Sequence, residues 1–276
     1  SNLISGYSIY NSFIGSGSYN SIYAPHSFIG GGNNNKIFSR YASVIGGVSN
    51  KIYGFGDNYS YHSSIIGGSS SLINVGQSSN IITSYRSYVT NSKKSSIVSS
   101  YLGNIINSKY SIVLNGSNLF ISDSYYSSSL GSKSGGIYTS HSSTLIGSNN
   151  SFIRQSYYGS IINSSNSNLQ NGSYISTIIN SNNSTIGNNS RNALIINSNV
   201  SNIYGNSAFP QDASTYSVIL NGKGNKIFSG INNTNIIINS KYSTIATRVS
   251  LSSIINSDGS KINSSLTGVT IIGVNN

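Results

Sequence analysis

The sequence predicts an all-β fold, and within that class a β-solenoid or β-roll of about 16 coils with roughly 15 to 18 residues in each coil. Three observations lead to this prediction. The composition favours strands and turns, aliphatic residues recur at a nearly constant spacing, and the segments between them are too short to bury a core without stacking on one another.

The composition is dominated by three residue types. Ser (66), Ile (42) and Asn (41) make up more than half of the 276 residues, and only 7% of the residues are charged. The chain has no Glu, which argues against helices, and its 36% hydrophobic content argues against disorder. Ile, Val, Tyr and Phe favour strands, whereas Ser, Asn and Gly favour turns. With no Cys, disulfides and thiolate chemistry are excluded.

A Ser-x-aliphatic motif, as in Ser27-Phe28-Ile29, repeats along the whole chain. Its third position forms a column with no polar member: Ile14, Ile29, Ile45, Ile66, Ile82, Val98, Val113, Leu130, Leu145, Ile162, Ile178, Ile195, Ile219, Ile237, Ile254 and Ile271. The spacing is nearly constant except for two longer steps, from Ile45 to Ile66 and from Ile195 to Ile219. A second aliphatic column, which starts at Ile22 and ends at Ile262, lies about half a repeat later. Helices would need apolar residues at i, i+3, i+4 and i+7, so each repeat is predicted to hold two short strands.

We expect a single repetitive domain over residues 1–276, with the two long steps carrying inserted loops at about 54–61 and 205–215. These loops are either binding elements or plain spacers. The column predicts that a charge at Ile162 displaces a coil, whereas a charge change at Lys133 has little effect.

Many predicted strands carry apolar residues on both faces, as Ile161 and Ile162 do. Neighbouring side chains in a strand point to opposite sides, and a solenoid has one interior. The second apolar face therefore predicts self-association, for which we expect a homotrimer, intertwined or side by side. A monomer or another oligomer is the alternative.

The units Ser27–Ala42 and Ser43–Gly54 resemble the Ser-x-Ile-Gly-Gly-x-x-Asn-x-Ile repeats of fibre proteins from phages and large DNA viruses. Such repeats often precede an endosialidase-type chaperone domain, which is commonly removed by self-cleavage. The units are similar, more loosely, to the β-roll heads of trimeric autotransporter adhesins. The resemblance implies a trimeric solenoid and a structural role, and it carries over no catalytic residue.

Catalytic and metal sites are not expected. The four acids, Asp57, Asp123, Asp212 and Asp258, lie in different repeats, whereas glycan hydrolysis needs two carboxylates close together. His26, His62 and His141 are equally scattered. His26 and His62 occupy similar positions just before the aliphatic column and are predicted to be exposed turn residues. We therefore predict neither an enzyme nor a cofactor.

Tyrosines recur just before the aliphatic column, where they are predicted to line a corner of the coil. They are either plain stacking residues or an exposed strip that contacts sugars, with Tyr41, Tyr110, Tyr126, Tyr158 and Tyr242 as the candidate residues. The net charge of +11 comes from Lys and Arg that are spread singly, apart from Lys93-Lys94. Such scatter is a weak signal for nucleic acid, so we expect none as a partner, and a cell-surface glycan is the candidate ligand.

These patterns favour a structural fibre or adhesin rod on a virion or cell surface, extracellular and without membrane insertion, that attaches through many weak contacts. One alternative is a monomeric solenoid that binds an ordered surface such as ice or a glycan. A glycan-degrading tailspike is the third hypothesis.

Overall fold

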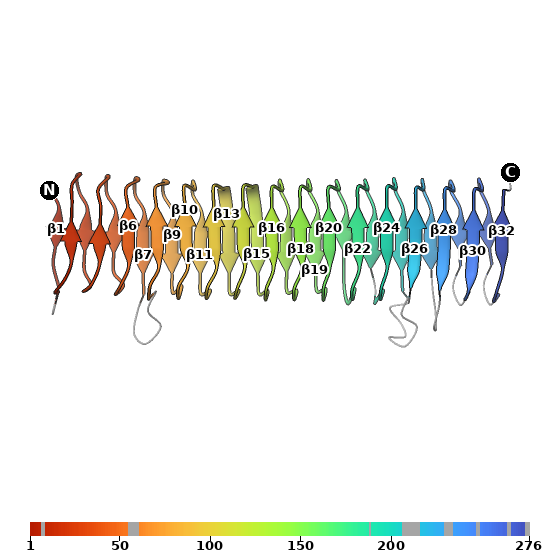
Figure 1. Cartoon of the computed structure of the whole chain (residues 1–276), viewed down its shortest axis with the longest axis horizontal. Coiled ribbons are helices and arrows are strands. Elements are labelled where there is room, and N and C mark those ends of the chain that lie inside the picture. Colours follow the sequence, from red (N-terminus) through yellow and green to blue (C-terminus); the bar gives the residue numbers. More distant parts are fainter. Residues whose placement is uncertain are drawn as a thin grey trace. The chain divides into compact units, whose positions relative to one another are not determined.

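The computed structural model describes residues 1–6, 9–54, 61–187, 189–205, 216–228, 234–246, 249–263 and 266–273. Within these residues the secondary structure consists of strands and turns, without a helix. The chain divides into two compact units, Ser1–Ser134 and Gly135–Asn276. In each unit the chain winds as a parallel β-solenoid with two strands per coil, which confirms the predicted fold class (Figure 1). Most of the two predicted loops, residues 55–60 and 206–215, lies outside the described residues.

Within each unit the odd-numbered strands form one sheet and the even-numbered strands form the other. In the first unit the odd sheet contains β1 (Leu3–Ile4), β3 (Ser21–Ile22), β5 (Lys36–Ile37), β7 (Lys51–Tyr53), β9 (Leu72–Asn74), β11 (Tyr88–Thr90), β13 (Tyr101–Ile106) and β15 (Ser117–Ser122). The even sheet contains β2 (Phe13–Ile14), β4 (Phe28–Ile29), β6 (Ser43–Ile45), β8 (Ser64–Ile66), β10 (Asn80–Ile82), β12 (Ser96–Val98), β14 (Ile112–Leu114) and β16 (Ser128–Leu130).

The second unit repeats this arrangement. Its odd sheet contains β17 (Gly136–Tyr138), β19 (Phe152–Arg154), β21 (Asn168–Leu169), β23 (Thr185–Gly187), β25 (Asn202–Tyr204), β27 (Lys226–Phe228), β29 (Thr244–Ile245) and β31 (Lys261–Ile262). Its even sheet contains β18 (Thr144–Ile146), β20 (Ser160–Ile162), β22 (Thr177–Ile179), β24 (Leu194–Ile196), β26 (Ser217–Leu220), β28 (Asn235–Ile238), β30 (Ser252–Ile255) and β32 (Thr270–Ile272).

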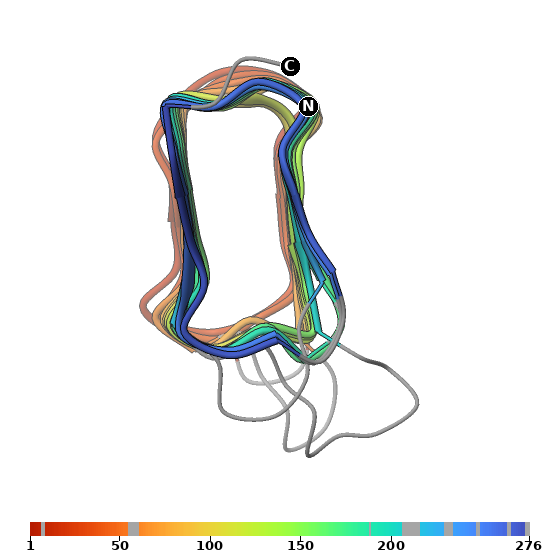
Figure 2. The ribbon, with the colours of Figure 1, turned by 90° about the vertical axis from the view of Figure 1, so that its right-hand side faces the viewer.

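Seen end on, a coil traces a rectangle whose long sides are the two sheets (Figure 2). Its short sides are turns. We call the turns that lead from an odd strand to the next even strand the first edge, and those that lead from an even strand to the next odd strand the second edge. Lys109 and Tyr110, between β13 and β14, lie on the first edge. Lys133, between β16 and β17, lies on the second edge.

The turns explain why the sequence is so rich in Asn. In the coil that contains β10 and β11, four turn residues have a left-handed backbone: Thr83, Arg86, Asn91 and Lys94, with φ between 45° and 50°. Asn adopts this conformation more readily than most residues do, and Gly adopts it at no cost. Asn therefore fills the same turn position in successive coils, as at Asn163, Asn180, Asn197, Asn221, Asn239 and Asn256.

Buried serines close the corners of each coil. Ser84 and Ser100, one coil apart, are both buried. The Ser100 amide donates to Ser84 Oγ over 3.2 Å, and Ser84 Oγ donates to the Ile82 carbonyl over 2.9 Å. Each serine thus satisfies a backbone amide of the next coil and a carbonyl of its own coil, groups that would otherwise be buried without a partner. The same pattern recurs at Ser92 and Ser108, and at Ser148 and Ser164.

In part of the chain, the buried residue of an even strand is not the member of the predicted aliphatic column but the residue before it. Eight column members are fully buried: Ile29, Val113, Leu145, Ile178, Ile195, Ile219, Ile237 and Ile254. Six other members point outward: Ile45, Ile66, Ile82, Val98, Leu130 and Ile162. In each of these strands the preceding residue is buried instead. This corrects the prediction for all six: Ile45, Ile66, Ile82, Val98, Leu130 and Ile162. The reason is that either of two adjacent aliphatic residues fits a column, and a slip of one residue exchanges the two faces of a strand.

The corrected interior column keeps the same spacing at every step from Ile65 to Ile161, and it contains one polar member, Ser129. The Ser129 hydroxyl is fully buried and has no hydrogen-bond partner. Ser129 pairs with Val113 on the neighbouring strand, so the small side chain takes a place that an aliphatic residue fills elsewhere. In the odd sheet the predicted second column is confirmed, because its members from Ile22 to Ile262 are all buried.

Candidate binding surfaces

The outer surface of the even sheet carries a row of aliphatic side chains, which we call the aliphatic face. In the first unit the row consists of Ile45, Ile66, Ile82, Val98, Leu114 and Leu130, and in the second unit of Ile146, Ile162, Ile179, Ile196, Leu220, Ile238, Ile255 and Ile272. Within each unit every member is the direct register partner of the next one. Ile45 is 47% exposed and Ile272 is 65% exposed, so part of this surface meets water.

The aliphatic face is also free of charge. No even-numbered strand among the described residues contains Lys, Arg, Asp or Tyr. The described cations lie on the two edges or in the odd sheet, which holds Lys36, Lys51, Arg154, Lys226 and Lys261. The two outer faces of a coil therefore differ in kind, since one is uncharged with an aliphatic row and the other is mixed and cationic. The aliphatic column predicted from the sequence had placed six members of this row in the interior, so it missed the surface that they form.

The first edge gathers aromatic and cationic residues. In the first unit it carries Tyr10, His26, Arg40, Tyr41, Tyr61, His62, Lys93, Lys94, Lys109, Tyr110, Tyr125 and Tyr126. In the second unit it carries His141, Tyr157, Tyr158, Tyr174, Arg191 and Tyr216. Tyr61 and Tyr216 also flank residues 55–60 and 206–215 in the sequence.

Four of the five candidate tyrosines, Tyr41, Tyr110, Tyr126 and Tyr158, lie on this first edge. Each of them stacks on, or meets, an aromatic neighbour. The ring centroids of Tyr110 and Tyr126 are 4.8 Å apart with an interplanar angle of 6°, and those of Tyr41 and His26 are 4.7 Å apart. Tyr242 instead lies on the second edge, since its amide donates to the Lys223 carbonyl there. The sequence grouped it with the others because a tyrosine precedes an aliphatic column on both edges.

Three lysines that looked scattered in the sequence form a cluster in the structure. Lys93 and Lys109 are separated in the sequence by one full coil, and the structure pairs them across adjacent coils. Lys94 lies beside Lys93 on the same turn. The matching signal in the sequence is a separation between cations that equals the repeat period.

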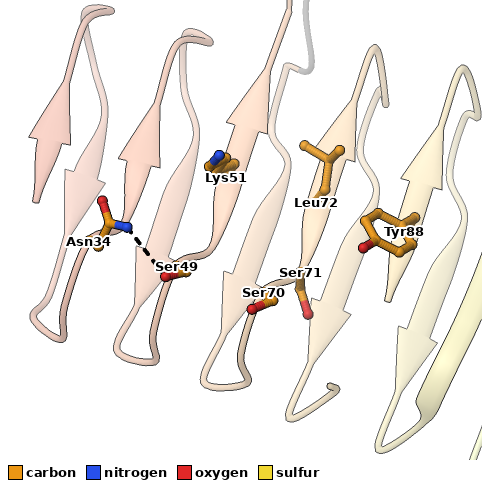
Figure 3. Close-up of a pocket in the computed structure, with 7 residues that line it drawn as sticks. All are labelled: Asn34, Ser49, Lys51, Ser70, Ser71, Leu72 and Tyr88. Carbon is orange, nitrogen blue, oxygen red and sulfur yellow. Dashed lines mark hydrogen bonds between the residues drawn. The ribbon is translucent and has the colours of Figure 1, made fainter. Parts of the chain in front are cut away.

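Among the surface hollows of the described residues, two place a cation beside an aromatic ring. One, of about 460 Å³, is lined by Tyr157, Gly172, Tyr174 and Arg191 on the first edge of the second unit. The other, of about 300 Å³, lies in the first unit and is lined by Asn34, Ser49, Lys51, Ser70, Ser71, Leu72 and Tyr88 (Figure 3). In it the Asn34 amide donates to Ser49 Oγ over 3.3 Å. The lining of both hollows contains a cation and an aromatic ring.

The acids and histidines do not assemble into a catalytic or metal site. Asp57 and Asp212 lie outside the described residues, while Asp123 and Asp258 belong to different units. The Asn107 amide donates to Asp123 Oδ1 over 3.1 Å. Within the described ranges no three His, Asp, Cys or Glu residues are grouped as metal ligands would be.

Burial raises the pKa of Tyr204, and a hydrogen bond with Thr185 partly offsets this rise.

Comparison with known proteins does not assign a family. No protein-family model matches the chain, and no curated protein matches it. Among solved structures, it is similar to an Arabidopsis UDP-N-acetylglucosamine acyltransferase, with 14% identity, a TM-score of 0.18, and coverage of 83% of this chain and 66% of that one. A second similar structure, described as a putative acetyltransferase from Desulfovibrio desulfuricans G20, has 10% identity, a TM-score of 0.15 and coverage of 83% and 67%. These scores are too low to carry an argument about function.

A search of the described residues finds no helix that is long and apolar enough to span a membrane.

Proposed function

We propose that the protein is a structural rod on the outside of a virion or cell, built from copies of this chain that pack through their aliphatic faces. The observation that carries the proposal is the uncharged aliphatic row, which stays in register from coil to coil. Burying apolar surface stabilises an assembly by roughly 25 cal/mol for each Å² removed from water. A second solenoid with the same coil spacing can match such a row residue by residue.

The distribution of charge also favours another copy as the partner. The net charge of +11 makes copies of this chain repel one another over most of their surface. Because the described Lys and Arg residues lie on the edges and the odd sheet, the aliphatic face is the side on which two copies can meet without placing cations opposite cations.

We propose three copies per rod. The aliphatic row occupies only one of the two outward positions on each even strand, and the other position is most often Ser, Thr or Asn, as at Ser64, Asn80 and Thr177. A narrow row lets three chains bring their rows to a common axis. The first edges are then repeated around the rod, so weak contacts with a host or a neighbouring surface add through effective concentration.

Charges placed in the row test the packing. Ile146, Ile162 and Ile179 are register partners on successive even strands. Replacing all three with Lys puts like charges against one another in the contact, which costs several kcal/mol. We expect sedimentation velocity to show wild-type chains as an assembly and the triple variant as single chains of about 29.2 kDa.

The matched control places three Lys on the odd sheet, at Phe152, Asn168 and Thr185, which are also register partners. This variant gains the same charge and should keep the wild-type mass. If both triple variants dissociate, net charge rather than the aliphatic face governs assembly. If neither dissociates, the aliphatic face is not the contact. Circular dichroism of both variants checks that they remain folded.

A further inference from the structure

The densest group of cations on the described surface lies on the first edge of the first unit. We call it the lysine–tyrosine cluster, and it consists of Lys93, Lys94, Lys109, Tyr110, Tyr125 and Tyr126. Lys93 and Lys109 are paired across adjacent coils, and Tyr125 follows Lys109 in the same column. All six side chains are exposed.

The tyrosines hold the lysines on this edge. Lys94 Nζ lies 5.3 Å from the centre of the Tyr110 ring, and Lys109 Nζ lies 5.1 Å from the centre of the Tyr125 ring. Cation–π contacts of this length are attractive, and they place the ammonium groups over the rings. Like charges at directly opposite positions of neighbouring strands repel each other, as those of Lys93 and Lys109 do. Asp123 is the acid next to the cluster in the chain, and its carboxylate accepts a hydrogen bond from Asn107.

We propose that the lysine–tyrosine cluster binds a linear anionic polysaccharide that carries sulfate or carboxylate groups. Three ammonium groups within two coils offer such a chain several contacts at a repeat of roughly 4.8 Å, the spacing between neighbouring strands. A bound anion also relieves the repulsion between Lys93 and Lys109. The phenol edges of Tyr110 and Tyr126 offer hydroxyl groups to the same ligand.

The stacking of the rings favours a polysaccharide over a single-stranded nucleic acid. Proteins bind single strands largely by stacking bases on open aromatic faces. Tyr110 and Tyr126 stack on each other with an interplanar angle of 6°, so the faces that they turn toward each other are not open to a base. The inference goes beyond the proposed rod and does not depend on it, because the cluster lies on an edge and not on the aliphatic face.

The test measures binding of dextran sulfate, with neutral dextran and single-stranded polythymidylate as comparison ligands. We expect the wild-type chain to bind dextran sulfate and to leave dextran unbound. With three phosphate-like contacts, affinity should fall roughly 20- to 40-fold between 50 mM and 200 mM salt. The triple variant Lys93→Gln, Lys94→Gln, Lys109→Gln should lose most of this binding and most of the salt dependence.

A control variant removes the same charge elsewhere, with Lys133→Gln, Lys226→Gln and Lys261→Gln, none of which lie in adjacent coils. It should retain the binding. Equal loss in both variants would show that net charge alone attracts the ligand and would overturn the proposal. So would tighter binding of polythymidylate through the same three lysines. Light scattering on each variant measures assembly separately from binding. A loss of assembly can therefore be distinguished from a loss of polysaccharide binding.

Discussion

Replacing Ile161 with Asp is expected to destabilise the second unit by more than about 4 kcal/mol, whereas the same change at Ile162 leaves a single folded chain nearly as stable as the wild type. Ile161 is fully buried and pairs with Leu145 and Ile178 on the strands on either side. An aspartate there loses the apolar contacts and buries a charge without a partner. The Ile162 side chain points to the outside of the same strand.

Thermal and denaturant unfolding, followed by circular dichroism, measures both variants. Because a solenoid can unfold coil by coil, the loss of signal for Ile161→Asp should begin at lower denaturant than for the wild type. The Ile162→Asp variant should instead show its effect in assembly. If the two variants unfolded alike, or if Ile162→Asp were the less stable one, the inward and outward assignments of β20 would be wrong.

Replacing Asn35 with Ala is expected to destabilise the first unit by about 2 kcal/mol or more. Asn35 is fully buried, and its side-chain amide donates to the carbonyls of Gly31 and Gly47 over 3.1 Å and 3.0 Å. Its Oδ1 accepts a hydrogen bond from the backbone N–H of Asn50 in the next coil over 3.0 Å. Alanine leaves the Gly31 carbonyl and the Asn50 backbone N–H without a partner, and each such group costs about 1–3 kcal/mol. The Gly47 carbonyl keeps its hydrogen bond from the Asn33 backbone N–H.

The control for Asn35 is only two residues away. Asn33 lies in the same turn but is exposed, so Asn33→Ala should change the unfolding midpoint little. Equal midpoints for the two alanine variants would contradict the role given to the buried amide, since both remove one asparagine side chain from the same turn.

The solenoid could be predicted from the sequence because every coil repeats the same pattern of residue types. The aliphatic column repeats, Gly and Asn mark the left-handed turn positions, and no competing pattern is present. What the column could not decide was which of two adjacent aliphatic residues faces inward, as at Ile65 and Ile66. Both satisfy the same hydrophobic pattern, and only the pairing of strands across coils separates them.

A better signal was present in the small residue two places before each inward side chain. Ser63 lies two places before Ile65, Ser79 lies two places before Ile81, and both serines are buried at a corner of the coil. Serine is so common in this chain that Ser64, before Ile66, gives the same reading. The buried serines of the corner can therefore be told from the other serines only when the constant spacing of the interior column is already known.

The candidate surfaces were harder to predict, since they depend on residues from separate coils. The pairing of Lys93 with Lys109 follows from the period once it is known, but the division of Tyr126 and Tyr242 between two edges does not. Both tyrosines precede a Ser and an aliphatic strand. Only a consistent count of alternate strands along the chain assigns them to opposite sides of the coil.

The measurement that tests the central claim most directly is the native mass of the unmodified chain, by light scattering over a range of concentrations. Three copies packed through the aliphatic face predict three times 29.2 kDa. Twice 29.2 kDa would keep the aliphatic face as the contact but replace the trimer with a pair. A mass of 29.2 kDa at every concentration would contradict the assembly and favour a single-chain module that binds an ordered surface.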